Sequence, residues 1–315
     1  EIEDQFLLDE GIKKGVTTVI SKVAFDRLLK KITRLKKKYS KQCGGSVCNS
    51  LLVAAGLGTK VGFCGTVGKE HFGKNISSEL NHYGVRFDSK VDDELGTGRC
   101  LVMVSGDAER TMNVYPGASR KISPAAISYT SLANTSWLFI EGYLLSDAET
   151  ISLIAGLIKF SRARGVKIAL TLSDAVLVAS YYENFRIIID LGVDLLFCNR
   201  PEAVALSGES QMKSVLEALT NFSETFVVTN GSAGAYFYDG DRIEHVSGLK
   251  AKAVDTTGAG DVFAGTFLYA VNFGHDYEYA TKLANFAAAR VVEQFGPKLS
   301  TEKFDSIKKH EVNGK

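Results

Sequence analysis

The stretch Asp255–Gly265 reads DTTGAGDVFAG and leads directly into the helix-like apolar run Val262–Ala270. Three residues without bulky side chains allow the backbone to come close to a ligand there: Gly258, Ala259 and Gly260. Their N–H groups, at a helix N-terminus, would form a site for a phosphate anion. Asp261 would lie at the mouth of that site, where a carboxylate can take the proton from an attacking hydroxyl. A glycine-rich turn capped by Asp261 has the same pattern, and the spacing alone leaves both interpretations open.

Before this stretch, short apolar runs alternate with segments of helical periodicity. Four runs predict strands: Trp137–Ile140, Val166–Leu172, Leu195–Cys198 and Thr225–Thr229. Ala148–Arg164 and Tyr181–Leu191 are helix-like segments between them. Such alternation is typical of βαβ units and a mainly parallel sheet, in which ligands bind beyond the carboxyl ends of the strands. We therefore expect an α/β fold.

The region 85–118 has a different sequence pattern, in which short β-prone runs are separated by glycine and aspartate. Arg99–Ser105 and Thr111–Tyr115 predict a hairpin or meander, and Val16–Ile20 could add another strand. We interpret the segments 13–22 and 85–118 as a small β-sheet lid. The sequence contains no long linker, internal repeat or low-complexity tract, so residues 1–315 are expected to form one unit.

Composition argues against several other classes of protein. A chain of 315 residues with 45% hydrophobic content can bury one large core. The formal net charge of +1 gives no reason to expect nucleic acid or an anionic membrane as a partner. No apolar run reaches the roughly 20 residues that span a bilayer, and the acidic segment 1–10 lacks the apolar core of a signal peptide. Five scattered cysteines without a C-x-x-C pair predict reduced thiols in a cytoplasmic protein.

One basic run, Lys30–Lys38, stands out from this balance. A nucleic-acid patch is one interpretation. A solvated helix face is the other, and we favour it because four apolar residues recur at helical spacing beneath the charges: Leu28, Leu29, Ile32 and Leu35.

The stretch Asp255–Leu268 resembles the C-terminal signature of the ribokinase-like (PfkB) carbohydrate kinases. Four other stretches resemble that family's motifs in order and spacing over about residues 1–300: CGGSVCNS at 43–50, GTVGKEHFG at 65–73, NRPE at 199–202 and TNGSAG at 229–234. Glu70 stands where the family usually has aspartate. The resemblance implies a three-layer α/β sandwich with a mainly parallel central sheet and a small β-sheet lid.

The resemblance also implies roles for individual residues. Asp261 matches the catalytic base, and the amides of residues 258–260 match the anion hole. The matches on the nucleotide side, which imply ATP, are Thr229, Gly231, Gly234, Thr256 and Asn285. Asn199 and Glu202 match a pair that organises Mg²⁺, largely through water. By themselves these two residues are also typical of a turn with a helix cap, and Asn285 is typical of a packed helix. A requirement for a monovalent cation stays open.

On the acceptor side, Gly44, Gly45 and Asn49 match the substrate motif, in which glycines let a sugar approach the backbone; a turn before a helix is the alternative. The stretches 108–118 and 140–145 look most like the adenosine-kinase-like branch. Tyr115 and Tyr143 could contact a nucleobase or belong to the core of the lid. We expect a small-molecule acceptor, either a nucleoside or an unphosphorylated sugar. A phosphosugar would require converging Arg or Lys residues, and strand parity does not tell which face Arg99 and Arg110 occupy.

Members of this family usually open with a strand whose carboxylate grips substrate hydroxyls, whereas this sequence starts after that point. We expect that roughly twenty residues carrying this strand are absent. A catalytically degenerate sensor of the same fold is the main alternative to a kinase. A nicotinamide-dependent enzyme is disfavoured because no G-x-G-x-x-G follows an early strand. Monomer and homodimer are both open.

Overall fold

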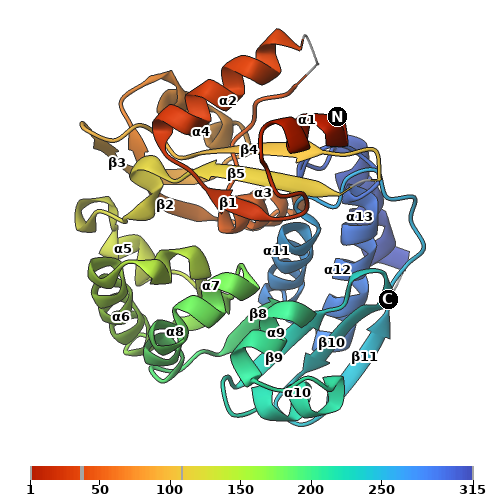
Figure 1. Cartoon of the computed structure of the whole chain (residues 1–315). Coiled ribbons are helices and arrows are strands. Elements are labelled where there is room, and N and C mark those ends of the chain that lie inside the picture. Colours follow the sequence, from red (N-terminus) through yellow and green to blue (C-terminus); the bar gives the residue numbers. More distant parts are fainter. Residues whose placement is uncertain (1, 36–38, 108, 314–315) are drawn as a thin grey trace.

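The computed structural model describes residues 2–35, 39–107 and 109–313. Its centre is a six-stranded sheet with the order β11-β10-β9-β8-β7-β6 (Figure 1). Of these six strands, β6 to β9 are parallel to one another, whereas β10 and β11 are antiparallel to their neighbours. All four predicted strands are confirmed. The bounds are β6 (Trp137–Glu141), β7 (Lys167–Thr171), β8 (Leu195–Asn199), β9 (Thr225–Thr229), β10 (Gly234–Tyr238) and β11 (Ile243–Ser247).

Helices cover both faces of this sheet. Alternate side chains of each strand point to opposite faces, so Leu195 and Phe197 pack in one apolar cluster while Leu196 and Cys198 pack in the other. The first face is covered by α3 (Ser46–Leu57), α11 (Ala259–Asn272), α12 (Tyr277–Val291) and α13 (Thr301–Asn313). The second is covered by α6 (Ala148–Arg162), α7 (Ala175–Ser180), α8 (Tyr182–Ile189), α9 (Arg200–Ser207) and α10 (Met212–Leu219). This is the predicted ribokinase-like sandwich, in which the helix predicted at 181–191 is shorter.

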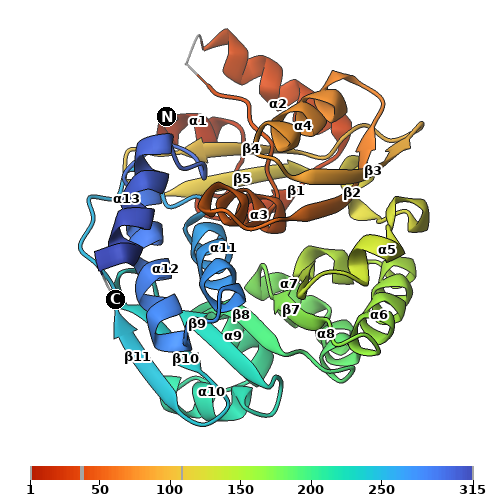
Figure 2. The same cartoon turned by 180° about the vertical axis from the view of Figure 1, so that it is seen from behind.

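A separate three-stranded sheet lies on the side of α3 and α11 that faces away from the six-stranded sheet (Figures 1 and 2). The predicted hairpin is present as antiparallel β4 and β5, and β1 pairs with β5 in parallel. Beside this sheet, Leu7, Leu28, Ile32 and Met103 form a small apolar cluster. The elements are α1 (Asp4–Asp9), β1 (Thr17–Val19), α2 (Lys22–Arg34), β4 (Arg99–Val104) and β5 (Arg110–Tyr115).

The basic run begins on α2, and its described part has the character of a solvated helix face. Leu28 and Ile32 are buried beneath it, and Lys31 pairs with Glu10 at 2.6 Å. Leu35 is 45% exposed, so the expectation that it lies beneath the charges is wrong. Residues 36–38 lie outside the described part of the chain.

A third, two-stranded parallel sheet joins β2 (Gly62–Gly68) and β3 (Arg86–Asp92), and α4 (His71–His82) connects them. The segment 85–118 is therefore divided between two sheets, because β3 pairs with β2 and not with β4 or β5. Within the described residues, β2 and β6 each have one hydrogen-bonded neighbour, and both line one large cavity.

The remaining short elements connect these layers. They are α5 (Tyr129–Leu132) and the 3-10 turns Gly117–Arg120, Pro124–Ala126, Gly142–Ser146 and Gly231–Ala233. Among the residues that the structure describes, we find no helix with the length and apolar character needed to cross a membrane.

Candidate active site

The site is organised around the loop that precedes α11. Both carboxylate oxygens of Asp255 hold this loop: Oδ1 accepts the Thr257 N–H and Oδ2 accepts the Gly296 N–H, each at 2.8 Å. Gly258 has a φ of +78°, and a Cβ atom there would lie 2.2 Å from Cβ of Pro297. Only glycine satisfies both conditions, so the turn into α11 is fixed by its sequence.

The N-terminus of α11 presents backbone N–H groups to the cavity. The first helical hydrogen bond runs from the Val262 N–H to the Gly258 carbonyl. Among the described residues, the N–H groups of Gly260 and Asp261 have no hydrogen-bond partner. Together with the helix dipole, unpartnered N–H groups at this position can bind an anion.

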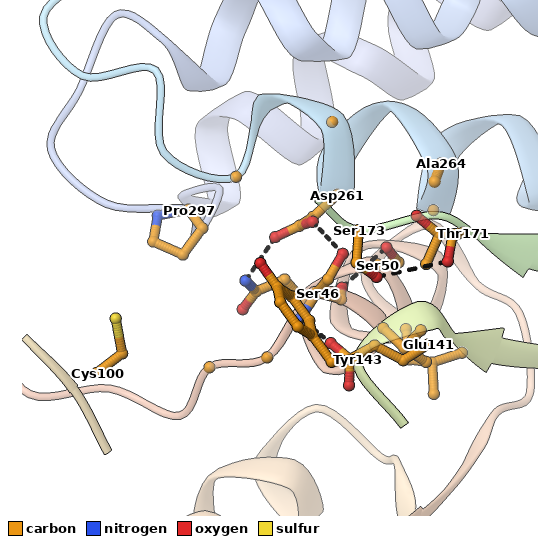
Figure 3. Close-up of a pocket in the computed structure, with 18 of the residues that line it drawn as sticks. Ser46, Ser50, Cys100, Glu141, Tyr143, Thr171, Ser173, Asp261, Ala264 and Pro297 are labelled. Atoms are coloured by element: carbon orange, nitrogen blue, oxygen red, sulfur yellow. Dashed lines mark hydrogen bonds between the residues drawn. The ribbon is translucent and has the colours of Figure 1, made fainter. Parts of the chain in front are cut away.

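Asp261 lies in the first turn of α11 and is bound by two side chains of α3. Its Oδ1 accepts a hydrogen bond from Ser46 Oγ at 2.5 Å, and its Oδ2 accepts one from Asn49 Nδ2 at 2.8 Å (Figure 3). Burial raises the pKa of Asp261, while these two hydrogen bonds and the charge of Arg110 oppose the rise. Its carboxylate is therefore oriented, and its basicity is greater than in water.

The close approach of α3 to α11 makes these contacts possible. A Cβ atom at Gly265 would lie 2.2 Å from the Ser50 carbonyl oxygen. With no side chain at that position, the two helices can cross with their backbones nearly in contact. The substrate motif on α3 and the aspartate on α11 are thus parts of one packed unit.

Glu141 is a residue of the site to which sequence reasoning gave no role. It ends β6, and its Oε1 accepts the Ser46 N–H at 2.8 Å, at the beginning of α3 (Figure 3). Burial, with a smaller contribution from the charge of Asp261, raises the pKa of Glu141 to about 7. An acidic residue at the carboxyl end of the apolar run WLFIE was the available signal, since ligands bind at that edge of a parallel sheet.

The structure separates the two arginines whose orientation the sequence left open. Arg110, on β5, reaches the loop before α11, where its Nη1 donates to the Thr256 carbonyl at 2.7 Å. Arg99, on β4, pairs with Asp26 at 3.1 Å and lies over the ring of Tyr115. Only Arg110 therefore contributes its charge to the neighbourhood of Asp261.

Asn199 and Glu202 form a reciprocal cap at the beginning of α9. Asn199 Oδ1 accepts the Glu202 N–H at 2.9 Å, and Glu202 Oε2 accepts the Asn199 N–H at 3.0 Å. Burial raises the pKa of Glu202 to about 7, and the charges of Asp174 and Asp261 add to the rise. The helix-cap interpretation is confirmed, whereas the magnesium role stays a prediction.

Four of the predicted nucleotide-side residues lie on or beside β9, β10 and α12, namely Thr229, Gly231, Gly234 and Asn285, whereas Thr256 lies in the loop before α11. Gly234 has a φ of +101°, and a Cβ atom there would lie 2.1 Å from the Val246 carbonyl oxygen. Asn285 is buried and donates from Nδ2 to the Val246 and Ser247 carbonyls at 3.2 and 3.3 Å. Its side chain therefore ties α12 to β11, and a contact with adenine stays a prediction.

One cavity runs from this edge past Asp261 to the three-stranded sheet. It is lined by every residue that the sequence singled out: Gly44, Gly45, Asn49, Tyr115, Tyr143, Asn199, Glu202, Thr229, Gly231, Gly234, Thr256, Gly258, Ala259, Gly260, Asp261 and Asn285. Asn49 is buried, and its Oδ1 has no hydrogen-bond partner among the described residues. The cavity is extensive, so shared lining places these residues together without assigning their roles.

The fold and the motifs agree with what the chain is similar to. The pfkB family carbohydrate kinase profile matches residues 17–303. The ribokinase of Lactococcus lactis subsp. lactis is 27% identical over 278 residues, which cover 86% of this chain and 87% of that protein. The crystal structure of adenosine kinase from Sinorhizobium meliloti is 29% identical with a TM-score of 0.89, covering 98% of this chain and 94% of that one.

A third structure shares the fold at lower identity. It is a putative ribokinase II from E. coli in complex with ATP and Mg²⁺, 21% identical with a TM-score of 0.75, covering 87% of this chain and 93% of that one. The family match extends over most of the present chain. The chain therefore belongs to the PfkB family of carbohydrate kinases and is a sugar or nucleoside kinase, a phosphotransferase with an alcohol group as acceptor.

Proposed function

We propose that this kinase transfers the γ-phosphoryl group of ATP to a primary hydroxyl of a nucleoside or an unphosphorylated sugar in the cytoplasm, with Asp261 as the base. The observation that carries the proposal is the position of Asp261 beside unpartnered N–H groups at the beginning of α11. A carboxylate there can accept the hydroxyl proton while the amides stabilise the charge of the transferring phosphoryl group. Intact catalytic groups argue against a degenerate sensor.

On the nucleotide side, Thr229 is the last residue of β9, Gly231 follows that strand, and Thr256 precedes the anion-binding loop. These positions support a path for the ATP phosphates along the carboxyl edge of the sheet, which ends at the N–H groups of Gly260 and Asp261. The Ala259 N–H, included in the predicted anion hole, instead donates to the Thr256 carbonyl at 3.3 Å. The unhindered surface at Gly231, where a Cβ atom would meet nothing within 4 Å, allows close approach of a phosphate. Asn285 would lie at the far end, against the base.

The donor set suits a magnesium ion bound largely through water. The charge of Asp174 raises the pKa of Glu202, and a divalent cation would relieve this repulsion. Mg²⁺ prefers oxygen ligands and retains several water molecules, so Asn199 and Glu202 can orient its hydration shell. The ion would neutralise phosphate charge during transfer.

On the acceptor side, the contacts favour an acceptor without a phosphate group. A phosphate would call for several converging cations, but Arg99 is engaged by Asp26 and by aromatic rings. Asn49 Oδ1 is a buried acceptor without a partner among the described residues, and a hydroxyl of a sugar or ribose would satisfy it. Tyr115 and Tyr143 line the cavity nearby and offer apolar surface.

We also infer that the segments 13–22 and 85–118 contain the moving lid. The base of β4 is anchored, since the Thr97 N–H donates to Glu70 Oε1 at 2.6 Å and Thr97 Oγ1 accepts the Gly68 N–H at 3.0 Å. Beyond this anchor, the three-stranded sheet is linked to the anion-binding loop through Arg110. A hinge at Thr97 would let the sheet close over the acceptor and exclude water.

The test is a turnover screen of nucleosides and sugars with ATP and Mg²⁺. We expect transfer to a CH₂OH group of one nucleoside or unphosphorylated sugar, identified by the mass and NMR spectrum of the product. Comparing K⁺ with Na⁺ measures any monovalent-cation requirement. Turnover confined to phosphosugars, or ATP binding without transfer to any acceptor, would overturn the proposal. Sedimentation of the same sample distinguishes monomer from homodimer.

A further inference from the structure

We propose that Lys298 and Glu79 are positioning residues for the phosphoryl acceptor, and that their ion pair fixes the acceptor loop, residues 39–45. The inference rests on the proposed function, because Gly44 and Gly45 of this loop match the substrate motif. Glu79 lies on α4, and Lys298 lies in the segment between α12 and α13. Sequence reasoning gave neither residue a role.

The acceptor loop has little structure of its own to hold it. It has no regular secondary structure, and all of its residues except Cys43 are exposed. Cys43 is buried, with 4% of its surface exposed. The next two residues, Gly44 and Gly45, have no side chains that could hold the loop. The position of the glycines therefore depends on the bonds made by the residues on either side of them.

Two carboxylates bracket the glycines through backbone hydrogen bonds. Glu79 Oε2 accepts the Cys43 N–H at 2.7 Å. On the other side of the glycines, Glu141 Oε1 accepts the Ser46 N–H at 2.8 Å. A carboxylate that accepts an N–H makes a stronger hydrogen bond than a neutral acceptor does. Only the two glycines lie between these bonds, so a displacement of either carboxylate would move the glycine backbone.

Lys298 supplies the positive charge that holds the Glu79 carboxylate. Its Nζ pairs with Glu79 Oε1 and lies 3.4 Å from Cys43 Sγ, so the lysine contacts both members of the anchor. The side chains of Lys298 and Glu79 are 16% and 28% exposed, and a partly buried pair is screened less by salt than a pair at the surface. Without the lysine, the carboxylate could rotate away from the Cys43 N–H.

The backbone next to Lys298 supports the anion-binding loop. The Gly296 N–H donates to Asp255 Oδ2 at 2.8 Å, and Pro297 packs against Gly258. One short segment therefore supports the loop before α11 through its backbone and its proline, and supports the acceptor loop through its lysine side chain. A substitution of the lysine should separate these two functions.

The position of Lys298 distinguishes an indirect effect from a direct contact with the acceptor. Glu79 and Cys43 line the cavity that contains Asp261, whereas Lys298 does not. The lysine would therefore act on the acceptor only through the loop. We expect its loss to raise the KM for the acceptor and to leave the KM for ATP unchanged, because the anion-binding loop keeps its backbone contacts.

The experiment compares the steady-state kinetics of Lys298→Met, Glu79→Ala and the double variant with ATP, using adenosine and ribose as the acceptors. Each single substitution should raise the KM for the acceptor at least about tenfold while the KM for ATP stays within about twofold. The double variant should lose no more than either single one. Lys298→Arg keeps the charge and should recover most of the acceptor affinity. Lys282→Met, which breaks the exposed Lys282–Glu278 pair on α12, is the matched control and should behave like the wild type.

Hydrogen exchange provides a second readout that needs no turnover. In Lys298→Met, exchange in residues 43–46 should be at least about tenfold faster than in the wild type, while residues 255–262 keep the wild-type rate. If neither acceptor is phosphorylated, the proposed function fails, whereas faster exchange in residues 43–46 still supports the anchored loop. Equal rises in the KM for ATP and for the acceptor, or unchanged exchange in residues 43–46, would overturn the positioning role.

Discussion

The proposed nucleotide side and the proposed acceptor side of Asp261 differ in how closely several of their glycines are packed. On the nucleotide side, glycines such as Gly234 and Gly258 are surrounded by backbone or proline atoms and have positive φ values. On the acceptor side, a Cβ atom at Gly44 would meet nothing within 4 Å, and Val19 and Val102 of the three-stranded sheet are exposed. Gly231, which faces open space, is the exception on the proposed nucleotide side. Positions packed like Gly234 and Gly258 should not tolerate a side chain, whereas Gly44 should. The comparison predicts that a side chain added at a packed glycine destabilises the protein, whereas one added at Gly44 does not.

We expect the largest effect on turnover from a substitution of Asp261, which lies between the two sides. Asp261→Asn should lower turnover by about 10²–10⁴-fold, the usual contribution of a general base. ATP affinity should change little because the backbone amides remain. Steady-state kinetics and calorimetric ATP titration measure the two quantities. Asp305→Asn, an exposed position on α13, is the control; near-normal turnover in the Asp261 variant would remove this residue from the mechanism.

Paired glycine substitutions test the comparison itself. Gly258→Ala should destabilise the fold by about 2–4 kcal/mol, since it combines a positive φ with overpacking against Pro297. Gly44→Ala should change stability by less than about 0.5 kcal/mol while raising the KM for the acceptor. Urea denaturation and kinetics of both variants provide the measurements. Equal destabilisation would show that the two sides are packed alike.

Glu202→Gln probes the nucleotide side without removing the helix cap, because glutamine can also serve in a capping box. We expect the Mg²⁺ concentration for half-maximal activity to rise about 10–100-fold, the usual cost of losing an outer-shell partner of a metal. The KM for the acceptor should stay near the wild-type value. An unchanged Mg²⁺ activation curve would contradict the assignment.

The ionisation of Glu141, which holds the first turn of α3, should make the stability of the folded protein depend on pH. Its pKa in the folded protein is raised to about 7, so the folded state binds a proton that the unfolded state releases at lower pH. The resulting stabilisation is complete below the unfolded pKa and is lost as pH rises through 7. Between pH 5 and 8, the wild-type Tm should fall by a few degrees more than that of Glu141→Gln. Parallel melting curves would contradict this account.

The smallest effect concerns the lid. The acceptor, more than an ATP analogue, should slow hydrogen exchange in residues 97–117, because a ligand shifts an equilibrium only through different affinities for its two states. Residues 185–189 of α8, which are largely buried and do not line the cavity, serve as an internal reference. If the ATP analogue alone slowed hydrogen exchange in this segment, both the lid assignment and the proposed position of the acceptor would be contradicted.

Local pattern predicted four of the six strands of the large sheet, β6 to β9, because they are continuous apolar runs between helices. It did not predict the antiparallel strands β10 and β11. The DTTGAGD stretch likewise carries its geometry in its residues, as Gly258 and Asp255 show. The acceptor side was harder to predict. Glu141 acts through a hydrogen bond to Ser46, 95 positions away, and β3 pairs with β2 and not with the hairpin that follows it. Such long-range choices depend on tertiary packing, which no short window of sequence contains.

Gly265 sets a limit on how this active site can diversify. Because its missing side chain lets α11 rest on the backbone of α3 at Ser50, the spacing between the first turn of α3 and Asp261 is at its physical minimum. A lineage that adopts a larger acceptor cannot gain room by spreading these helices without withdrawing Ser46 and Asn49 from Asp261. New room must come from the loop at 39–45 and from the three-stranded sheet. Selection for new substrates should therefore leave its substitutions in those segments, while the helix crossing remains as it is.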